Sequence, residues 1–327
     1  MMTDVFGTLP DGDTVERVTI TDGHLRAHLI SYGATLQDLR LTGIAHPLVL
    51  GTQTLEDYFV NLRFFGATVG RYANRIAGGR FSIGGATCQT DLNEKNRTTL
   101  HGGAKGLGAV NWQIESASDV AVTFVAEQPD GHMGFPGALV ARTTYRIAHG
   151  ALEIEMSATC DKTCPISIAN HSYFNLDGTD DVTAHMLSVA AENYLPVDER
   201  MIPTGQIAPV AGTKFDFRTP RAIGLAGYDH NFCLTPGDGL REVAVLTGTN
   251  GLTLRLETDA PGLQVYDAQH LTAEGQPGLD GRRYTTHAGL AMETQMWPDA
   301  PNQPGFPDAL VPAGKTYRSR NRLTFTA

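Results

Sequence analysis

The chain has 327 residues, of which 41% are hydrophobic and 18% charged, a composition typical of an ordinary globular protein. Its 25 Lys and Arg against 35 Asp and Glu give a formal net charge of -10, which indicates neither a nucleic-acid-binding face nor a polybasic membrane anchor. No stretch approaches the roughly 18 uninterrupted apolar residues of a membrane helix, and residues 1–13 lack the features of a signal peptide. We therefore expect a cytoplasmic protein with no nucleic-acid or membrane partner, either a monomer or a homodimer.

Short β-strands dominate the predicted elements. The best helix candidate, residues 55–62, is short, and no longer amphipathic helix follows. Gly84 and Gly85 separate residues 81–83 from residues 86–88, as in a tight hairpin. Alternation with period two then predicts half-buried strands at residues 120–124, 152–156 and 252–257. With 36 Gly and 17 Pro as turn signals, we predict an all-β fold, a sandwich or barrel of antiparallel strands, in a single domain spanning residues 1–327.

The cysteine and histidine spacings do not indicate a metal site. None of Cys88, Cys160, Cys164 and Cys233 forms a CxxC pair, so we expect reduced thiols rather than a disulfide or metal site. The histidines form neither HExxH nor His-x-His. The glycines of residues 102–108 do not follow GxGxxG and lack a βαβ context, which argues against a nucleotide. We predict no metal and no cofactor.

Residues 170–176 (NHSYFNL) are the most informative segment. They place the imidazole of His171 among amides, a hydroxyl and the rings of Tyr173 and Phe174, a mixture that suits a sugar ring. Histidine can donate or accept a proton near neutral pH, so His171 is a candidate acid or base. The alternative is a buried histidine at the end of a strand.

Two further segments carry groups that could bind a polyol. Residues 70–76 contain Arg71 and Arg75 with Asn74 beside the second arginine, and a guanidinium has five donors that match sugar hydroxyls or a carboxylate. The alternative for either arginine is a structural ion pair within a turn. His101 precedes two glycines, which would let the backbone approach a ligand closely, but a structural role is equally compatible.

Three candidates come from the second half of the chain. Asp229 lies in a run of polar and aromatic residues that suits hydroxyl binding, or in a turn before a strand at residues 231–234. Gln264 falls on a predicted strand, where a lone glutamine is more often solvated than functional. Glu293 lies in the mostly uncharged run 286–297, where partial desolvation would raise its pKa. It is therefore the first candidate for a general base.

Together these segments resemble the aldose 1-epimerase (galactose mutarotase) family over nearly the whole chain. The matching motifs are SYGAT at 31–35, GRYANRI at 70–76, LHGG at 100–103, NHSYFNL at 170–176, YLPVDE at 194–199, IPTG at 202–205, FDFR at 215–218, YDHNF at 228–232, ETQ at 293–295 and WPD at 297–299. The resemblance implies a large antiparallel β-sandwich of the galactose mutarotase type, with the sugar in an open cleft. It also implies that His171 is the general acid, that Glu293 is the general base, and that the sugar is bound by Asn74, Arg75, His101, Tyr173, Asp229 and Gln264.

The implied reaction interconverts the α and β anomers of free aldohexoses such as glucose and galactose, without a cofactor. Two departures from the family pattern stand out. Residues 267–270 read DAQH where many relatives have small or amide residues, which we expect to alter one rim of the cleft and so the sugar preference. Ala291 stands where a cysteine is common, which we interpret as packing.

Three other functions are compatible with parts of the pattern. A hexose-phosphate 1-epimerase would need a cationic clamp, against which the acidic charge balance argues. A non-catalytic sugar-binding or sensing protein would not need both His171 and Glu293. A glycoside hydrolase would need a second carboxylate, for which Asp229 is the candidate.

Overall fold

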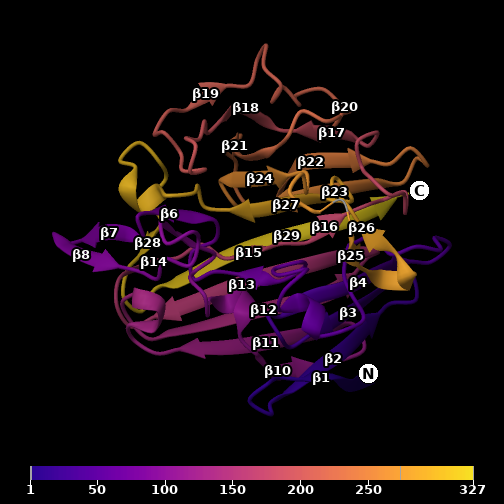
Figure 1. The fold of residues 1–327 in the computed structure, drawn as a ribbon, viewed down its shortest axis with the longest axis horizontal. Coiled ribbons are helices and arrows are strands. Elements are labelled where there is room, and N and C mark those ends of the chain that lie inside the picture. The colour runs from indigo at the N-terminus through magenta and orange to yellow at the C-terminus, as the bar shows by residue number, and fades with distance from the viewer. Residues whose placement is uncertain (1, 273, 327) are drawn as a thin grey trace.

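Almost all regular structure in the computed structural model, which describes residues 2–272 and 274–326, is antiparallel β-sheet (Figure 1). The largest sheet has nine strands, in the order β10 (Gln113–Ala117), β11 (Ala121–Gln128), β12 (Leu139–Ala148), β13 (Ala151–Cys160), β29 (Thr316–Thr326), β23 (Thr253–Thr258), β22 (Arg241–Thr247), β17 (Met186–Val189) and β20 (Arg221–Ala222). A six-stranded sheet has the order β16 (Tyr173–Phe174), β27 (Leu290–Gln295), β24 (Gly262–Tyr266), β21 (Asp229–Leu234), β18 (Ala191–Tyr194) and β19 (Ala208–Pro209).

Smaller sheets complete the fold. Four strands near the N-terminus form a meander of β1 (Met2–Thr8), β2 (Thr14–Thr21), β3 (Leu25–Ile30) and β4 (Thr35–Leu41). The two-stranded pairs are β5 (Thr68–Val69) with β15 (Ala169–Asn170), β6 (Arg75–Ala77) with β9 (Thr98–Leu100), β7 (Arg80–Ile83) with β8 (Ala86–Gln89), β14 (Cys164–Pro165) with β28 (Leu310–Val311), and β25 (Gln276–Pro277) with β26 (Arg283–Tyr284).

Helical structure is limited to single turns, as the sequence predicts. The 3-10 helices are η1 (Glu56–Tyr58), η2 (Leu107–Ala109), η3 (His132–Gly134), η4 (Leu279–Gly281) and η5 (Ala300–Asn302). The helix predicted at residues 55–62 is wrong except for the single turn η1. Two helical turns are too short to be stable alone, and the segment instead adopts turns that bury Leu55 and Leu62. In the described part of the chain, no helix is long and apolar enough to span a membrane.

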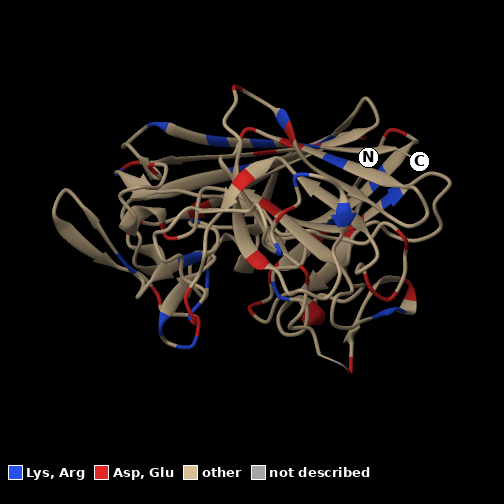
Figure 2. Ribbon diagram, turned by 90° about the horizontal axis from the view of Figure 1, so that it is seen from above, with Lys and Arg blue, Asp and Glu red and all other residues tan. Residues whose placement is uncertain are grey.

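The predicted strands and hairpin are confirmed, with small differences at their ends. Ile83 pairs with Ala86 across the Gly84-Gly85 turn. The strand predicted at residues 231–234 begins two residues earlier, at Asp229. In the view of Figure 2, positions of Lys and Arg and positions of Asp and Glu both occur along most of the ribbon.

The hydrophobic core lies between the nine-stranded sheet and the smaller sheets. Alternate residues of β13, such as Ile154 and Met156, are fully buried in the same cluster as Leu263 of β24 and Met292 of β27. Residues of β24 and β27 with the opposite parity therefore face away from this core.

Strand register places the predicted site residues on that second face of the six-stranded sheet. In an antiparallel sheet, directly paired residues point to the same side. The paired rows are Glu293 with Gln264 and Asn231, and Tyr173 with Ala291, Tyr266 and Asp229. Residues far apart in the sequence thus converge because four strands align.

Candidate active site

Seven of the eight predicted site residues line one pocket with a volume of ≈ 180 Å³; the exception is Gln264. The six-stranded sheet supplies Tyr173, Asp229 and Glu293. The opposite wall comes from the ends of short strands, where Asn74 precedes β6 and His101 follows β9. The pocket therefore lies between the second face of the sheet and the loops that cover it.

His171 and Glu293 face each other in this pocket, with His171 Nε2 3.6 Å from Glu293 Oε1. Both side chains are buried, at 6% and 2% exposure. His171 lies between β15 and β16, where its backbone N–H donates to Ala67 O and its carbonyl accepts from Gly66 N, both at 2.9 Å. Its ring stacks on Tyr173 with centroids 5.1 Å apart. The imidazole is therefore fixed by backbone and ring contacts while it faces the carboxylate.

Burial shifts the pKa values of this pair in opposite directions. Desolvation lowers the pKa of His171 to about 4. Desolvation and the nearby Asp229 carboxylate raise the pKa of Glu293 well above its ordinary value, while Arg75 opposes the shift. Glu293 Oε2 has no hydrogen-bond partner among the described residues. The two shifts have opposite signs, an arrangement that is common in acid–base sites.

A network of charged groups borders the pair. Arg75 forms a bidentate ion pair with Glu94, with both nitrogen–oxygen distances at 2.8 Å, and its Nη1 lies 3.8 Å from Asp229 Oδ2. Gln264 Nε2 donates to Asp229 Oδ1 at 2.6 Å. The alternative of a solvated Gln264 is wrong, because only 3% of the residue is exposed. Gln264 orients a pocket carboxylate and does not line the pocket itself.

His101 is held as a hydrogen-bond donor. Its Nδ1 accepts from the Asn74 backbone N–H at 3.2 Å, and burial lowers its pKa well below the ordinary value, so the neutral ring carries its proton on Nε2. The donor atoms of His101, His171 and Glu293 lie within 4.8 Å of one another, a set that could bind zinc. However, a metal-bound histidine normally donates its other N–H. The Asn74 contact therefore favours His101 as a donor to a hydroxyl, and the expectation of no metal stays a prediction.

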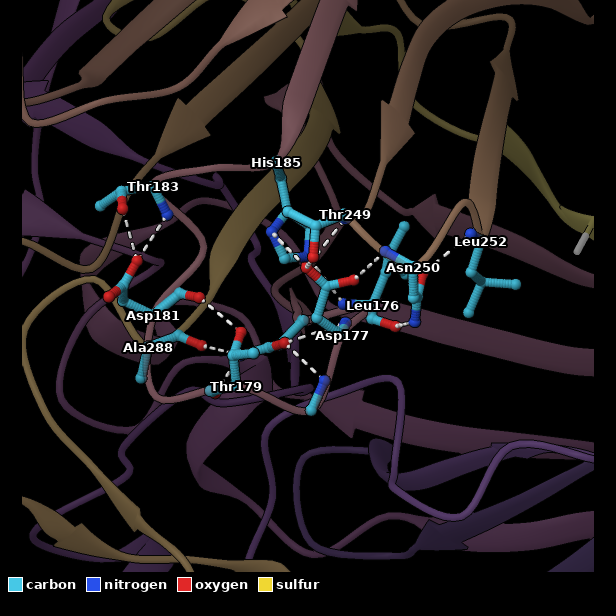
Figure 3. Close-up of polar contacts among 12 residues, drawn as sticks. Leu176, Asp177, Thr179, Asp181, Thr183, His185, Thr249, Asn250, Leu252 and Ala288 are labelled. Carbon is cyan, nitrogen blue, oxygen red and sulfur yellow. Dashed lines mark hydrogen bonds and ion pairs between the residues drawn. The ribbon is translucent and has the colours of Figure 1, made fainter.

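The chain following His171 is anchored by a polar cluster that extends from the buried Leu176 and His185 to the exposed Thr249 and Asn250 (Figure 3). Leu176 N–H donates to His185 Nε2 at 3.0 Å, and Asn250 Nδ2 donates to Leu176 O at 2.8 Å. The Asp177 carboxylate accepts from the backbone N–H of Thr249 at 2.9 Å and from that of Asn250 at 3.1 Å. These contacts connect the segment after His171 to the turn between β22 and β23.

Sequence reasoning did not select five other residues that line the pocket: Arg63, Phe64, Leu100, Tyr266 and His270. Tyr266 pairs with Asp229 across β21 and β24, so the alternation of β24 could have identified it. His270 belongs to the DAQH departure at residues 267–270, and it does lie at the pocket rim as expected. Phe64 adopts a φ of 73° in a loop that no motif marks.

Comparisons with known proteins identify the family of the chain. A family model described as aldose 1-epimerase matches residues 16–324. The galactose mutarotase of Mus musculus is 40% identical over 336 aligned residues, covering 98% of this chain and 97% of that protein. The aldose 1-epimerase of Escherichia coli strain K12 is 36% identical, with 100% of both chains covered.

A solved structure shows the same architecture. The galactose 1-epimerase of Lactobacillus acidophilus NCFM matches with a TM-score of 0.87 at 28% identity, covering 100% of this chain and 99% of that one. The sequence-based recognition and the fold prediction are therefore confirmed. The family model matches most of the chain, and full-length relatives are 36% and 40% identical to it. The solved structure shares its antiparallel β-sheet architecture. The chain therefore belongs to the aldose 1-epimerase family.

Proposed function

We propose that this mutarotase pocket interconverts the α and β anomers of free aldohexoses such as glucose and galactose, with Glu293 as the general base and His171 as the general acid. The observation that carries the assignment is the buried contact of 3.6 Å between His171 Nε2 and Glu293 Oε1. The C1 hydroxyl and the ring oxygen of an aldose are bonded to the same carbon. An acid and a base that act on both atoms must therefore lie side by side.

The reaction requires two proton transfers at C1. Glu293 takes the proton of the C1 hydroxyl while His171 donates a proton to the ring oxygen. The bond between C1 and the ring oxygen breaks, and C1 becomes the carbonyl carbon of the open-chain aldehyde. Rotation about the C1–C2 bond presents the other carbonyl face, and the reverse transfers close the ring as the other anomer.

The protonation preferences of the pair fit the open-chain state. Before ring opening, the reactive arrangement is a protonated His171 and an ionised Glu293; afterwards, His171 is neutral and Glu293 is protonated. Burial lowers the pKa of His171 and raises that of Glu293, which favours the second arrangement. The electrostatics of the site therefore stabilise the protonation arrangement of the ring-opened intermediate more than that of the closed sugar. Preferential stabilisation of such a high-energy state favours catalysis.

The two arginines that line the pocket, Arg63 and Arg75, are already engaged by other groups, which favours a neutral sugar over a sugar phosphate. Arg75 is already neutralised by Glu94 and lies near Asp229. Arg63 donates to Ala104 O and packs over the Phe64 ring. A phosphate would need cations that are free to form bidentate contacts. A purely sugar-binding function would not need a buried acid–base pair.

Polarimetry tests the proposal. Freshly dissolved α-D-glucose and α-D-galactose should mutarotate faster with the protein than spontaneously. His171→Asn should lower this acceleration by about 10²–10⁴-fold, the usual contribution of one positioned acid or base, while sugar binding persists. Exposed His24 provides the matched control, His24→Asn, which should leave the rate unchanged.

Two outcomes would overturn the proposal in different ways. Acceleration of glucose 6-phosphate alone would indicate a hexose-phosphate 1-epimerase. Measurable sugar binding without any acceleration would indicate a sensing protein.

We also infer that the chain acts in the cytoplasm as a single domain, without nucleic-acid or membrane partners. The four cysteines are free thiols, as is usual in a reducing compartment. One hydrophobic cluster draws residues from strands throughout the chain, which supports one domain. Gel filtration would decide between a monomer and a homodimer.

A further inference from the structure

Four aromatic rings form a continuous series that includes the His171 imidazole. The Phe64 ring lies nearly parallel to the imidazole, with centroids 6.5 Å apart and an interplanar angle of 17°. The imidazole in turn stacks on Tyr173 at 5.1 Å and 26°, and Tyr173 stacks on Phe65 at 4.0 Å and 21°. The adjacent residues Phe64 and Phe65 therefore contact different rings of the His171 segment.

The turn that carries Phe64 also holds the backbone of His171. Gly66 N–H donates to His171 O, and His171 N–H donates to Ala67 O, both at 2.9 Å. Ala67 N–H donates to Phe64 O at 3.0 Å, which closes the turn. The Phe64 ring is therefore attached to a turn that is fixed relative to the histidine.

Phe64 adopts a backbone conformation that is unfavourable for a bulky side chain. Its φ of 73° lies in the left-handed region, which favours glycine. Such a conformation persists only where the surrounding structure imposes it, and it is concentrated at functional sites. Phe64 lines the catalytic pocket, whereas Phe65 is buried in a hydrophobic cluster with Tyr173. The residue in the unfavourable conformation is thus the one whose ring stacks on His171.

Ring contacts, rather than hydrogen bonds, orient the His171 imidazole within the described part of the chain. Its Nδ1 has no partner there, although a functional histidine is usually oriented by a hydrogen bond at its second nitrogen. Its Nε2 is 3.6 Å from Glu293 Oε1, beyond the usual hydrogen-bond distance. The rings of Phe64 and Tyr173 lie nearly parallel to the imidazole, and the His101 ring meets it edge-on at 5.2 Å. Rotation of the imidazole out of its plane would bring its edge towards these rings.

We propose that Phe64 is a positioning residue whose ring holds the His171 imidazole in the plane that directs Nε2 towards Glu293; this role depends on the proposed function of His171 as the general acid. The same contact has a second effect, because the apolar ring of Phe64 adjoins a histidine that is only 6% exposed. It therefore contributes to the desolvation that lowers the pKa of His171.

The ionisable groups that contact the imidazole or the Phe64 ring are Glu293, Tyr173, His101 and Arg63. A substitution of Phe64 leaves all four in the chain, so a change in the titration of His171 reports the loss of the ring. Arg63 lies 4.7 Å from the centroid of the Phe64 ring. If its guanidinium moved towards His171, it would lower the pKa of the imidazole, which is opposite to the effect of lost desolvation.

An NMR titration of His171 in the sugar-free, full-length protein tests the contact without relying on turnover. In wild type, the ring should titrate near the pKa of about 4. Phe64→Leu keeps an apolar side chain but removes the planar ring, and should raise the midpoint towards the ordinary value of 6.5. Phe59→Leu is the matched control, because Phe59 contacts the Tyr32 ring, and it should leave the midpoint unchanged. An unmoved midpoint in Phe64→Leu would overturn the proposal.

Polarimetry separates positioning from sugar binding. Phe64→Leu should lower kcat by up to about 10²-fold, the cost that a misplacement of about 1 Å can have, with little change in KM. Phe64→Tyr keeps the ring and should restore most of the rate, whereas Phe59→Leu should match wild type. A raised KM with unchanged kcat would show that Phe64 only contacts the sugar, and would refute the positioning role.

Phe64→Gly removes the ring from a backbone that glycine adopts without strain, so it provides a second variant if Phe64→Leu does not fold. It should show the same loss of kcat and the same rise in the His171 midpoint. A wild-type kcat in Phe64→Gly would show that the turn alone positions His171, and would overturn the role of the ring. If wild type does not accelerate mutarotation, the proposed function fails, while the NMR titration still decides whether Phe64 packs on His171.

Discussion

Replacing Glu293 by Gln removes the proposed base with almost no change in shape, so it isolates the charge. In the reactive state, the cation of His171 and the anion of Glu293 attract each other across 3.6 Å, which at an effective dielectric constant of about 20 amounts to about 4.6 kcal/mol. Losing this attraction makes the protonated His171 harder to form, which would lower the fraction of enzyme in the reactive arrangement by a factor of about 2,000. This factor lies within the 10²–10⁴ range typical of one general base.

Polarimetry of fresh α-D-glucose gives kcat and KM after subtraction of the spontaneous rate. We expect Glu293→Gln to lower kcat by about 10³-fold while changing KM little, because the amide can still contact a hydroxyl. Glu127→Gln is the matched control: Glu127 is exposed on β11 and should be silent. A Glu293→Gln enzyme with turnover within a few-fold of wild type would remove Glu293 from the chemistry.

Three further predictions follow from the electrostatics and hydrogen bonds of the site. The pH profile of kcat/KM should be bell-shaped, because the active form of the pair carries one proton in total. Activity should fall at low pH, where His171 with its pKa of about 4 also becomes protonated. It should fall again at high pH, above the raised pKa of Glu293, where the pair loses its proton. Asp229→Asn removes a charge that raises the pKa of Glu293, so polarimetry over a pH series should show the alkaline limb displaced to lower pH; an unmoved limb would contradict the coupling. Asn175→Ala removes the hydrogen bond to the buried carbonyl of Ala288, just before β27, and should lower the free energy of unfolding in urea by about 1–3 kcal/mol. Asn61→Ala, at an exposed asparagine, should leave it unchanged.

The chemistry of the site could be predicted because it depends on residue types that are rarely buried without reason. His171 within NHSYFNL and Glu293 within an uncharged run both stand out in the sequence, and the structure brings them into contact. The resemblance to a known family supplied the sugar-binding set, of which the pocket contains Asn74, Arg75 and His101 among others.

Residues that reach the pocket through loop geometry could not be predicted in the same way. Phe64 stacks on His171 with an interplanar angle of 17°, but it reaches that position through a left-handed backbone conformation that its sequence context does not mark. Arg71 and Arg75 lie in one motif and end in different environments: Arg75 lines the pocket beside Glu94, and Arg71 enters the protein interior beside Cys164. The backbone path of residues 70–76 decides which arginine points into the pocket, and this path could not be predicted from the sequence.

Strand β27 lacks the alternation of hydrophobic and polar residues, so the sequence alone could not show which of its faces carries the site. All six residues of this strand are buried. Leu290 and Met292 pack in the main hydrophobic cluster, whereas on the other face Ala291 packs in a second cluster and Glu293 lines the pocket. The alternation of side chains along a strand still indicates that Ala291 and Glu293 share a face. It cannot indicate which face contacts the hydrophobic core when both faces are buried. The assignment comes from the neighbouring strand, where Gln264 pairs with Glu293 and binds Asp229. Glu293 Oε2 has no hydrogen-bond partner in the described structure, which supports the proposal that this buried carboxylate acts as the base.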